Sequence, residues 1–131
     1  GYLCFEKDDH TEDRVSVSEM NAIMVNSDTR LVTLSACSSG LVRGENVFNG
    51  VASGLIQIGV PAVVGMQGTP RVDVMVKFIE EMYSGLAEGK NLSEAVNSGR
   101  LAIYREKPPA WFMPVVYLRS SDNTYGQLFD L

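Results

Sequence analysis

The sequence predicts an α/β fold in which a mostly parallel sheet is flanked by helices, giving three layers. Two continuous apolar runs, Arg30–Ala36 and Val60–Met66, have the pattern of strands buried on both faces. Segments with helical spacing alternate with these strands, which is typical of parallel sheets. The chain has 131 residues, 45% of them hydrophobic, which is enough for one compact domain.

The first predicted elements are short. The apolar run Tyr2–Phe5 predicts a strand, and we expect Cys4 within it to be a core residue. The polar stretch Glu6–Arg14 predicts a solvated loop. Ser18 is expected to cap a short helix over Glu19–Val25, because serine oxygens accept N–H bonds at helix starts.

The second helix is expected to begin after Asn46 and to end at Gly59, a residue type that commonly terminates helices. Gly50 and Gly54 lie one turn apart on this helix. Glycine lowers helix stability, so we expect the pair to allow close packing against a neighbour.

The third helix is expected to begin at Thr69-Pro70, since a threonine cap followed by proline is a strong helix start, and to end near Gly89. Its inward positions are predicted from their helical spacing. They are Val72, Met75, Phe78, Ile79, Met82, Tyr83 and Leu86.

Asn91, with Glu94 three residues later, predicts a capping box at the start of a last helix that runs to about Glu106. The run Pro114–Leu118 predicts a closing strand. In the turn-rich tail, we expect Leu128 and Phe129 to pair at a sheet edge.

Composition excludes several classes of function. A net charge of −5 argues against direct nucleic-acid binding, which requires a basic face. No run is long enough to span a bilayer, and no signal-peptide pattern is present, so we expect a cytoplasmic protein without a membrane partner. Two cysteines and one histidine are too few for a metal site, and no cofactor is expected.

Cys37 is the candidate nucleophile. It follows the predicted strand Arg30–Ala36 directly and precedes three small residues, beginning with Ser38. The carboxyl end of such a strand opens into the crevice where ligands bind. Ser38, Ser39 and Gly40 are small enough to leave the thiol accessible and to let backbone N–H groups converge on a substrate oxyanion. The alternative from the residues alone is an inert core cysteine.

Two other segments bear on the site. His10, the chain's one histidine, lies in a solvated acidic stretch, which favours a surface histidine over a catalytic base. Gln67 and Gly68 follow the strand Val60–Met66 and should project from the same sheet edge as Cys37. They form either a wall of a substrate pocket or an ordinary β–α turn.

Three segments in order resemble the CHAT domain, a family in the caspase and separase clan of cysteine peptidases. They are Leu34–Gly40, Val51–Gln67 and Pro114–Ser120. The resemblance covers nearly the whole chain. It implies a caspase-like three-layer sandwich and a Cys–His dyad in which Cys37 is the nucleophile. It also implies that the backbone N–H of Cys37 is one of the oxyanion donors.

The same resemblance implies that part of the domain lies outside this chain. The histidine of the family precedes the strand that matches Tyr2–Phe5, so we expect it upstream of Gly1, together with the N-terminal strands of the sheet. Residues 1–131 are then a single unit, the C-terminal portion of a CHAT peptidase domain. We expect this unit to fold only with the missing part, and a proteolytic cut before Gly1 is one origin of its start.

Many CHAT domains carry an acidic residue shortly after the Met-Gln segment, close to the pocket for the substrate's P1 side chain. Here Val72 occupies that position, Asp73 comes one residue later, and Gly68 stands where an aromatic residue is frequent. Gln67, Gly68 and Asp73 are therefore the expected pocket residues, and a basic P1 preference stays open.

The predicted function is a cysteine endopeptidase regulated by attached or partner domains. Its expected partners are a protein or peptide substrate and the N-terminal segment or chain that supplies the histidine. The alternative is a catalytically inactive CHAT-like module with a binding or regulatory role. A flavodoxin-like small-molecule binder follows from fold class alone.

Overall fold

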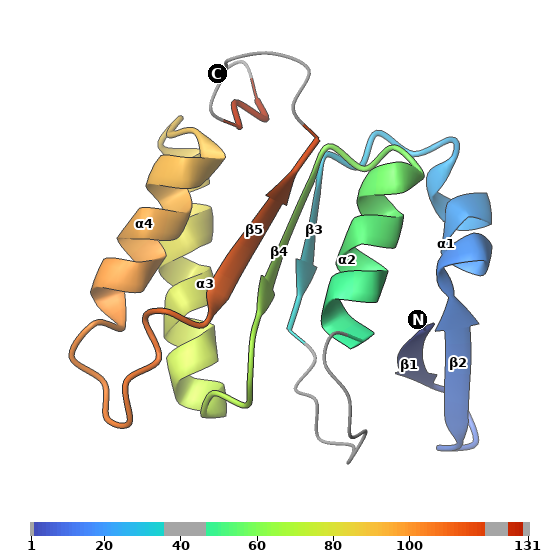
Figure 1. Cartoon of the computed structure of the whole chain (residues 1–131), viewed down its shortest axis with the longest axis horizontal. Helices are drawn as coiled ribbons and strands as arrows, with labels where there is room; N and C mark the ends of the chain where they lie inside the picture. Colours follow the sequence, from blue (N-terminus) through green and yellow to red (C-terminus); the bar gives the residue numbers. More distant parts are fainter. Residues whose placement is uncertain (1, 36–46, 120–125, 130–131) are drawn as a thin grey trace.

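The computed structural model describes residues 2–35, 47–119 and 126–129. In this part of the chain, a central sheet of three strands lies between helices (Figure 1). The strands are β3 (Leu31–Leu34), β4 (Ala62–Met66) and β5 (Pro114–Leu118), in the order β3-β4-β5. The mixed α/β class is confirmed.

The described sheet is mixed, and the expectation of a mostly parallel sheet is not confirmed. β3 and β4 are parallel, whereas β4 and β5 are antiparallel. Two helices, α3 (Val72–Ala87) and α4 (Leu92–Ala102), connect β4 to β5. α3 runs back from the end of β4 toward its start, and α4 runs in the opposite direction. β5 therefore starts at the edge of the sheet where β4 ends.

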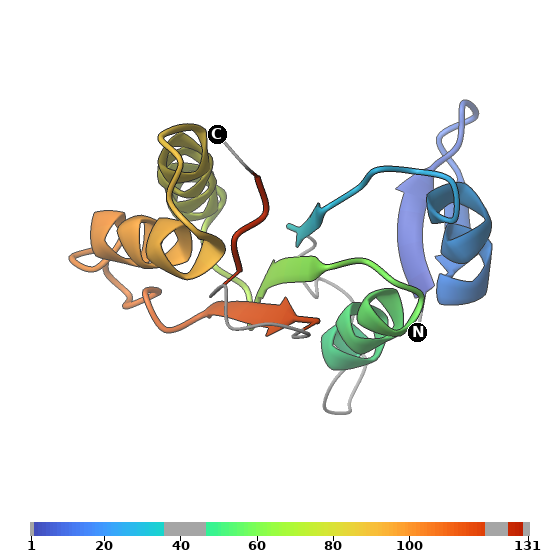
Figure 2. The same ribbon diagram turned by 90° about the horizontal axis from the view of Figure 1, so that it is seen from above.

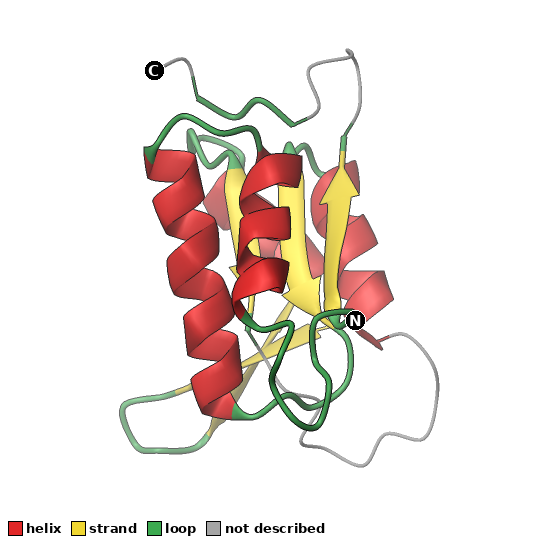
Figure 3. Ribbon diagram, turned by 90° about the vertical axis from the view of Figure 1, so that its left-hand side faces the viewer, coloured by secondary structure: helices red, strands yellow, loops and turns green. Residues whose placement is uncertain are grey.

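The two faces of β4 serve different cores. Ala62, Val64 and Met66 belong to the core beneath α3 and α4, whereas Val63 packs with α2 (Val47–Gln57) on the other face. Figures 2 and 3 show the strands between these helical layers. All five residues of β4 are buried, as expected for a strand covered on both faces.

Glycine allows α3 and α4 to approach closely. A Cβ atom on Gly99 would lie 2.7 Å from Cδ2 of Phe78, and one on Gly85 would lie 3.2 Å from the Cα atom of Ala95. The ring of Phe78 is 1% exposed and therefore packs directly against the backbone of α4. The sequence analysis singled out neither glycine.

The start of α3 and part of its buried face differ from the prediction. The N-cap is Arg71, two residues after Thr69, because the chain stays extended through Arg71 (ψ 145°). Val74 is buried, while Val72 and Tyr83 are 66% and 44% exposed. The buried face of α3 thus centres on Val74 and Phe78. Two of the predicted inward residues, Val72 and Tyr83, are instead exposed to solvent.

The last helix begins as predicted. The Asn91 side chain accepts a hydrogen bond from the Glu94 N–H at 2.9 Å, and the Glu94 side chain accepts one from the Asn91 N–H. The helix ends at Ala102 rather than near Glu106, with Ile103 as its C-cap.

The described tail, residues 126–129, contains no strand, so the expected edge pairing of Leu128 and Phe129 is absent there. Leu128 is instead buried in the core beneath α3 and α4, and its carbonyl accepts a hydrogen bond from Arg30 at 2.7 Å.

On the other face, α2 packs against α1 (Val17–Met24). A Cβ atom on Gly54 would lie 2.9 Å from a methyl group of Val17, which confirms close packing there, whereas one on Gly50 would meet nothing within 4 Å. Gly59 follows α2 with φ +110°, as expected of a terminating glycine. Asn46, the predicted cap, lies outside the described residues.

Before α1, the chain forms an antiparallel hairpin of β1 (Tyr2–Glu6) and β2 (Glu12–Ser16). The predicted loop over residues 6–14 is therefore wrong in its second half, where backbone pairing with β1 outweighs the polar composition. The predicted cap is also shifted: Ser16, not Ser18, caps α1 in a capping box with Glu19. Cys4 is exposed in this hairpin, contrary to its expected place in the core.

Candidate functional site

The sheet edge at the carboxyl ends of β3 and β4 is the place where the predicted site residues converge. Leu34 at the end of β3 is opposite Gly65 near the end of β4, and β5 starts at the same edge, the lower one in Figure 1. Ser35, the last described residue after β3, is exposed. The predicted nucleophile Cys37 and its neighbour Ser38 lie outside the described residues, so their roles stay predictions.

Gln67 and Gly68 follow β4 at this edge, where the sequence analysis placed them, and both are exposed. The Gln67 N–H donates a hydrogen bond to the Met113 carbonyl at 2.8 Å, which ties the end of β4 to the loop before β5. Gly68 has φ +75°, a conformation that side chains disfavour. A Cβ atom there would lie 3.8 Å from Met113 Cε, so the backbone rather than space favours glycine.

Asp73 lies in the first turn of α3, beside this edge, and is held by Arg71. The Arg71 Nε donates to Oδ1 of Asp73 at 3.0 Å, and Nη2 donates to Oδ2. The hydrogen bonds from Arg71 hold the pKa of Asp73 below its ordinary value, and those to Asp73 raise the pKa of Arg71. Asp73 is thus ionised at neutral pH and already paired.

Two further charges complete what we call the Arg71 cluster, which consists of Arg71, Asp73, Lys77 and Glu106. Nη2 of Arg71 lies 3.8 Å from Oε2 of Glu106, and Lys77 Nζ lies 3.1 Å from its Oε1. Two positive and two negative side chains therefore balance. The sequence shows the Arg71–Asp73 spacing, but Glu106 is too distant in the chain to be paired with them by any local pattern.

Three exposed aromatic residues, Tyr104, Trp111 and Phe112, lie on the loop between α4 and β5. We call them the aromatic wall. Trp111 has its ring centroid 6.0 Å from each of the other two rings, and its contact with Phe112 is edge-to-face. Their exposed fractions are 60%, 43% and 56% respectively. The sequence analysis passed over them, because an exposed aromatic residue has the same local pattern as a buried one.

His10 and Cys4, both in the hairpin, are poorly suited to act as a catalytic base or a nucleophile. The His10 side chain is 86% exposed and pairs with Glu6 at the hairpin turn, as expected of a surface histidine. The hydrogen bond from Cys4 Sγ to Glu12, 3.2 Å long, raises the pKa of the Cys4 thiol above its ordinary value. A thiol with a raised pKa is a poor nucleophile at neutral pH.

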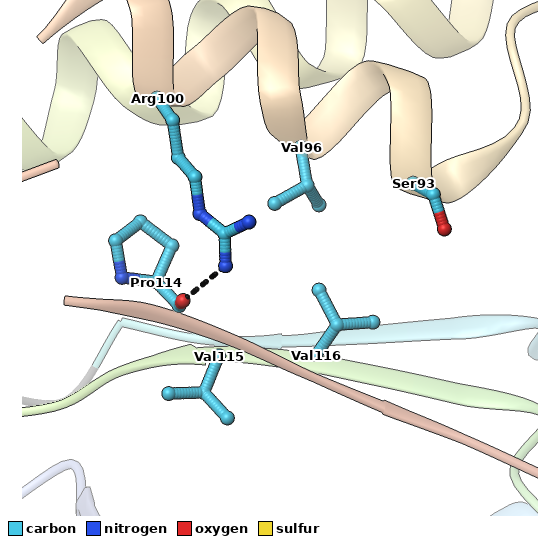
Figure 4. A pocket seen from close by; sticks show the side chains of 6 residues that line it. All are labelled: Ser93, Val96, Arg100, Pro114, Val115 and Val116. Atoms are coloured by element: carbon cyan, nitrogen blue, oxygen red, sulfur yellow. Dashed lines mark hydrogen bonds between the residues drawn. The ribbon is translucent and has the colours of Figure 1, made fainter. Parts of the chain in front are cut away.

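A separate hollow of about 400 Å³ lies between α4 and β5 (Figure 4). The lining residues are Ser93, Val96, Arg100, Pro114, Val115 and Val116. Arg100 donates a hydrogen bond to the Pro114 carbonyl at 2.8 Å. The lining contains no nucleophilic thiol and no general base, so this hollow is not a candidate catalytic site.

Within residues 2–35, 47–119 and 126–129, no three His, Cys, Asp or Glu side chains are grouped in a way that could hold a metal ion. None of the described helices is both long and apolar enough to cross a membrane.

Comparison with known proteins identifies the family. The family model described as CHAT domain matches residues 1–125, which is nearly the full length of the chain. Among curated proteins, no match to the chain is found.

Proposed function

We propose, on the premise that this chain belongs to the CHAT domain family, that it carries the nucleophile of a cysteine endopeptidase. CHAT domains are a caspase-like peptidase family. The observation that supports the proposal most directly is the parallel pairing of β3 and β4, with Leu34 opposite Gly65. The chain leaves β3 three residues before Cys37 at the edge where Gln67, Gly68 and Asp73 also lie.

The proposed reaction is acyl transfer through a thioester. The Cys37 thiolate attacks the scissile carbonyl carbon, and the backbone N–H groups at Cys37 and Ser38 stabilise the oxyanion that forms. A histidine protonates the leaving amine as the C–N bond breaks. The same histidine then deprotonates a water molecule, which hydrolyses the thioester and releases the thiolate.

The proposal requires a histidine from outside this chain. His10 is exposed and paired with Glu6, whereas a general base must be held in a cleft by an orienting partner. The required imidazole therefore belongs to the N-terminal segment of the domain or to a partner chain. β3 pairs with β4 along one edge only in the described sheet, which leaves its other edge for an added strand.

The decisive experiment is labelling of the complete protein with an electrophilic peptide that forms a thioether with an active-site thiolate. We expect labelling of the wild type and of Cys4→Ala, and loss of both labelling and substrate cleavage in Cys37→Ala. Cys4→Ala is the matched control because Cys4 is exposed yet has a raised thiol pKa. Cleavage that persists in Cys37→Ala would refute the proposal.

A second candidate is a binding or regulatory module that keeps the fold without catalysis. The position of His10 favours it, since the chain's one imidazole is solvated and paired with Glu6 rather than held beside the candidate edge. The two candidates differ in one measurement. A module would bind its partner protein equally well in the wild type and in Cys37→Ala, and no thioester would accumulate in either protein.

A further inference from the structure

In the described sheet, β5 pairs with β4 along one edge only, and its other edge is open. Just beyond the two ends of this pair, the Met113 carbonyl accepts a hydrogen bond from the β4 side at 2.8 Å and the Arg119 N–H donates one at 2.9 Å. Alternate residues of an antiparallel pair bond to the partner strand. The odd-numbered residues of β5 therefore bond to β4, and the N–H and C=O groups of Val116 and Leu118 point to the open edge.

The hollow between α4 and β5 lies along this open edge. Figure 4 shows the side chains of Val96 on α4 and Val116 on β5 directed toward each other, whereas that of Val115 points to the opposite face of the sheet. Val115 nevertheless lines the hollow, which therefore reaches the backbone of β5. The volume of about 400 Å³ lies within the usual range of ligand sites, about 300–1,000 Å³.

Arg100 places a positive charge at one end of this hollow. Its side chain is partly buried and donates a hydrogen bond to the Pro114 carbonyl at 2.8 Å. A guanidinium has several further N–H donors. No carboxylate in the described part of the chain forms an ion pair with it. Because removing a charge from water is costly unless a partner is present, an anionic group in the hollow would be stabilised there.

The open edge of β5 ends at this positive charge. Pro114 has no N–H to donate, and its carbonyl already accepts a bond from Arg100. Residues 103–113 also join α4 to β5 at this end. A strand antiparallel to β5 would bond first to Leu118 and then to Val116, and would end beside the guanidinium. Its carboxyl end, rather than its amino end, would reach Arg100.

We infer that this hollow is a docking site for the carboxyl-terminal residues of a protein partner, which add to β5 as an antiparallel strand. The terminal carboxylate pairs with Arg100, and Val116 and Leu118 supply the backbone hydrogen bonds. The partner residue opposite Val116 directs its side chain to the same face of the sheet, toward Val96, and is therefore apolar. The inference goes beyond the proposed function and does not depend on it.

The test is binding of hexapeptides to the complete protein, measured by fluorescence polarisation. The probe is a library of peptides labelled at the amino end, prepared once with free carboxyl ends and once with carboxamide ends. We expect the best free-acid peptides to carry an apolar residue close to the carboxyl end. They should bind at least about tenfold more tightly than their amides, the effect of a charge-assisted hydrogen bond. Equal affinity of acid and amide, or no binding by either set, would overturn the inference.

Variants of Arg100 test the carboxylate contact. Arg100→Gln should weaken binding of the free acids at least about tenfold and leave the amides unchanged. Arg105→Gln is the matched control, because it removes the same charge from an exposed residue just after α4, and it should bind as the wild type does. If Arg100→Gln still distinguishes acid from amide, the role of Arg100 is structural and the inference is wrong.

Variants of Val116 test the strand contact. Val116→Pro removes the outward N–H without removing a bond to β4, which proline tolerates on an edge strand, and it should abolish binding. Val116→Ala keeps this N–H and should retain most of the affinity; circular dichroism verifies that both variants fold. A wild-type dimer that Val116→Pro converts to a monomer would show that a second copy occupies the edge, and would overturn the inference. Cys37→Ala should bind the peptides as the wild type does, so its loss of cleavage concerns the proposed function alone.

Discussion

The two faces of the central sheet are covered in different ways. Beneath α3 and α4, a continuous core surrounds Phe78, and glycines bring the two helices into backbone contact. On the other face, α1 and α2 bury a smaller set around Leu55, and the hairpin β1–β2 beside them is largely exposed. The comparison suggests that the α3–α4 face carries most of the stability, while the hairpin face contributes little of its own.

The largest expected effect is at the centre of the first face. Phe78→Ala removes a ring that is 1% exposed and should lower the free energy of unfolding by about 3–5 kcal/mol in urea denaturation. Phe5→Ala removes the same ring from the hairpin, where it is 51% exposed, and should change stability by no more than about 0.5 kcal/mol. Equal losses would contradict the comparison.

Glycine substitutions sharpen the comparison at the level of helix contacts. Gly99→Ala places a Cβ atom 2.7 Å from Phe78 and 2.9 Å from its backbone oxygen, so it should destabilise by about 1–3 kcal/mol. Gly50→Ala meets nothing within 4 Å in α2 and should stabilise by about 0.5–1 kcal/mol, since alanine favours helix. Thermal unfolding of both variants measures the difference, and opposite signs are expected.

The capping boxes of α1 and α4 allow the stability of the two faces of the sheet to be compared with the same kind of substitution. Asn91→Ala and Ser16→Ala should each lower stability by about 1 kcal/mol. For Asn91 the loss should appear in global unfolding, and for Ser16 in faster hydrogen exchange of α1 alone, because a sparsely packed element opens locally. Exchange that accelerates uniformly over the chain in Ser16→Ala would show that the hairpin face unfolds only with the rest.

The Ser16 box should also depend on pH. Hydrogen bonds from Ser16 lower the pKa of Glu19 below its ordinary value. The stability that the ionised Glu19 side chain adds to the capping box is therefore present above the ordinary glutamate pKa. It is lost as the pH falls through the lower pKa of Glu19 in the folded state. The difference in α1 exchange between Ser16→Ala and wild type should shrink below that pH, and a difference that grows in acid would contradict the assignment.

The smallest expected effect concerns Cys4. Because its hydrogen bond to Glu12 raises the thiol pKa, alkylation by iodoacetamide at pH 8 should be a few-fold slower than for an unperturbed cysteine thiol. Glu12→Gln should restore the ordinary rate. The matched measurement is made in a Cys37→Ala background, so that a single thiol reports, and an unchanged rate would refute the role of Glu12.

Local patterns predicted most of the elements. The strand at Val60–Met66, the helix that Gly59 terminates and the box at Asn91 and Glu94 were all visible in the chain, because burial and capping depend on nearby residues. The errors have a common cause. β2 and the exposure of Cys4 depend on strand pairing across the hairpin, and the inward turn of Val74 depends on packing against other elements, neither of which the residue types alone specify.

For the candidate site the division is similar. The sequence by itself determined the family, the order of strands and helices from α1 onward, and the residues Gln67, Gly68 and Asp73 that follow β4. Only the tertiary structure decided the direction of β5, the close contact of α3 with α4, and the pairing of Asp73 with Arg71 beside Glu106. Spacing along the chain specifies which groups are available, but whether a charge is free or neutralised depends on which other groups the folded chain places within a few ångströms of it.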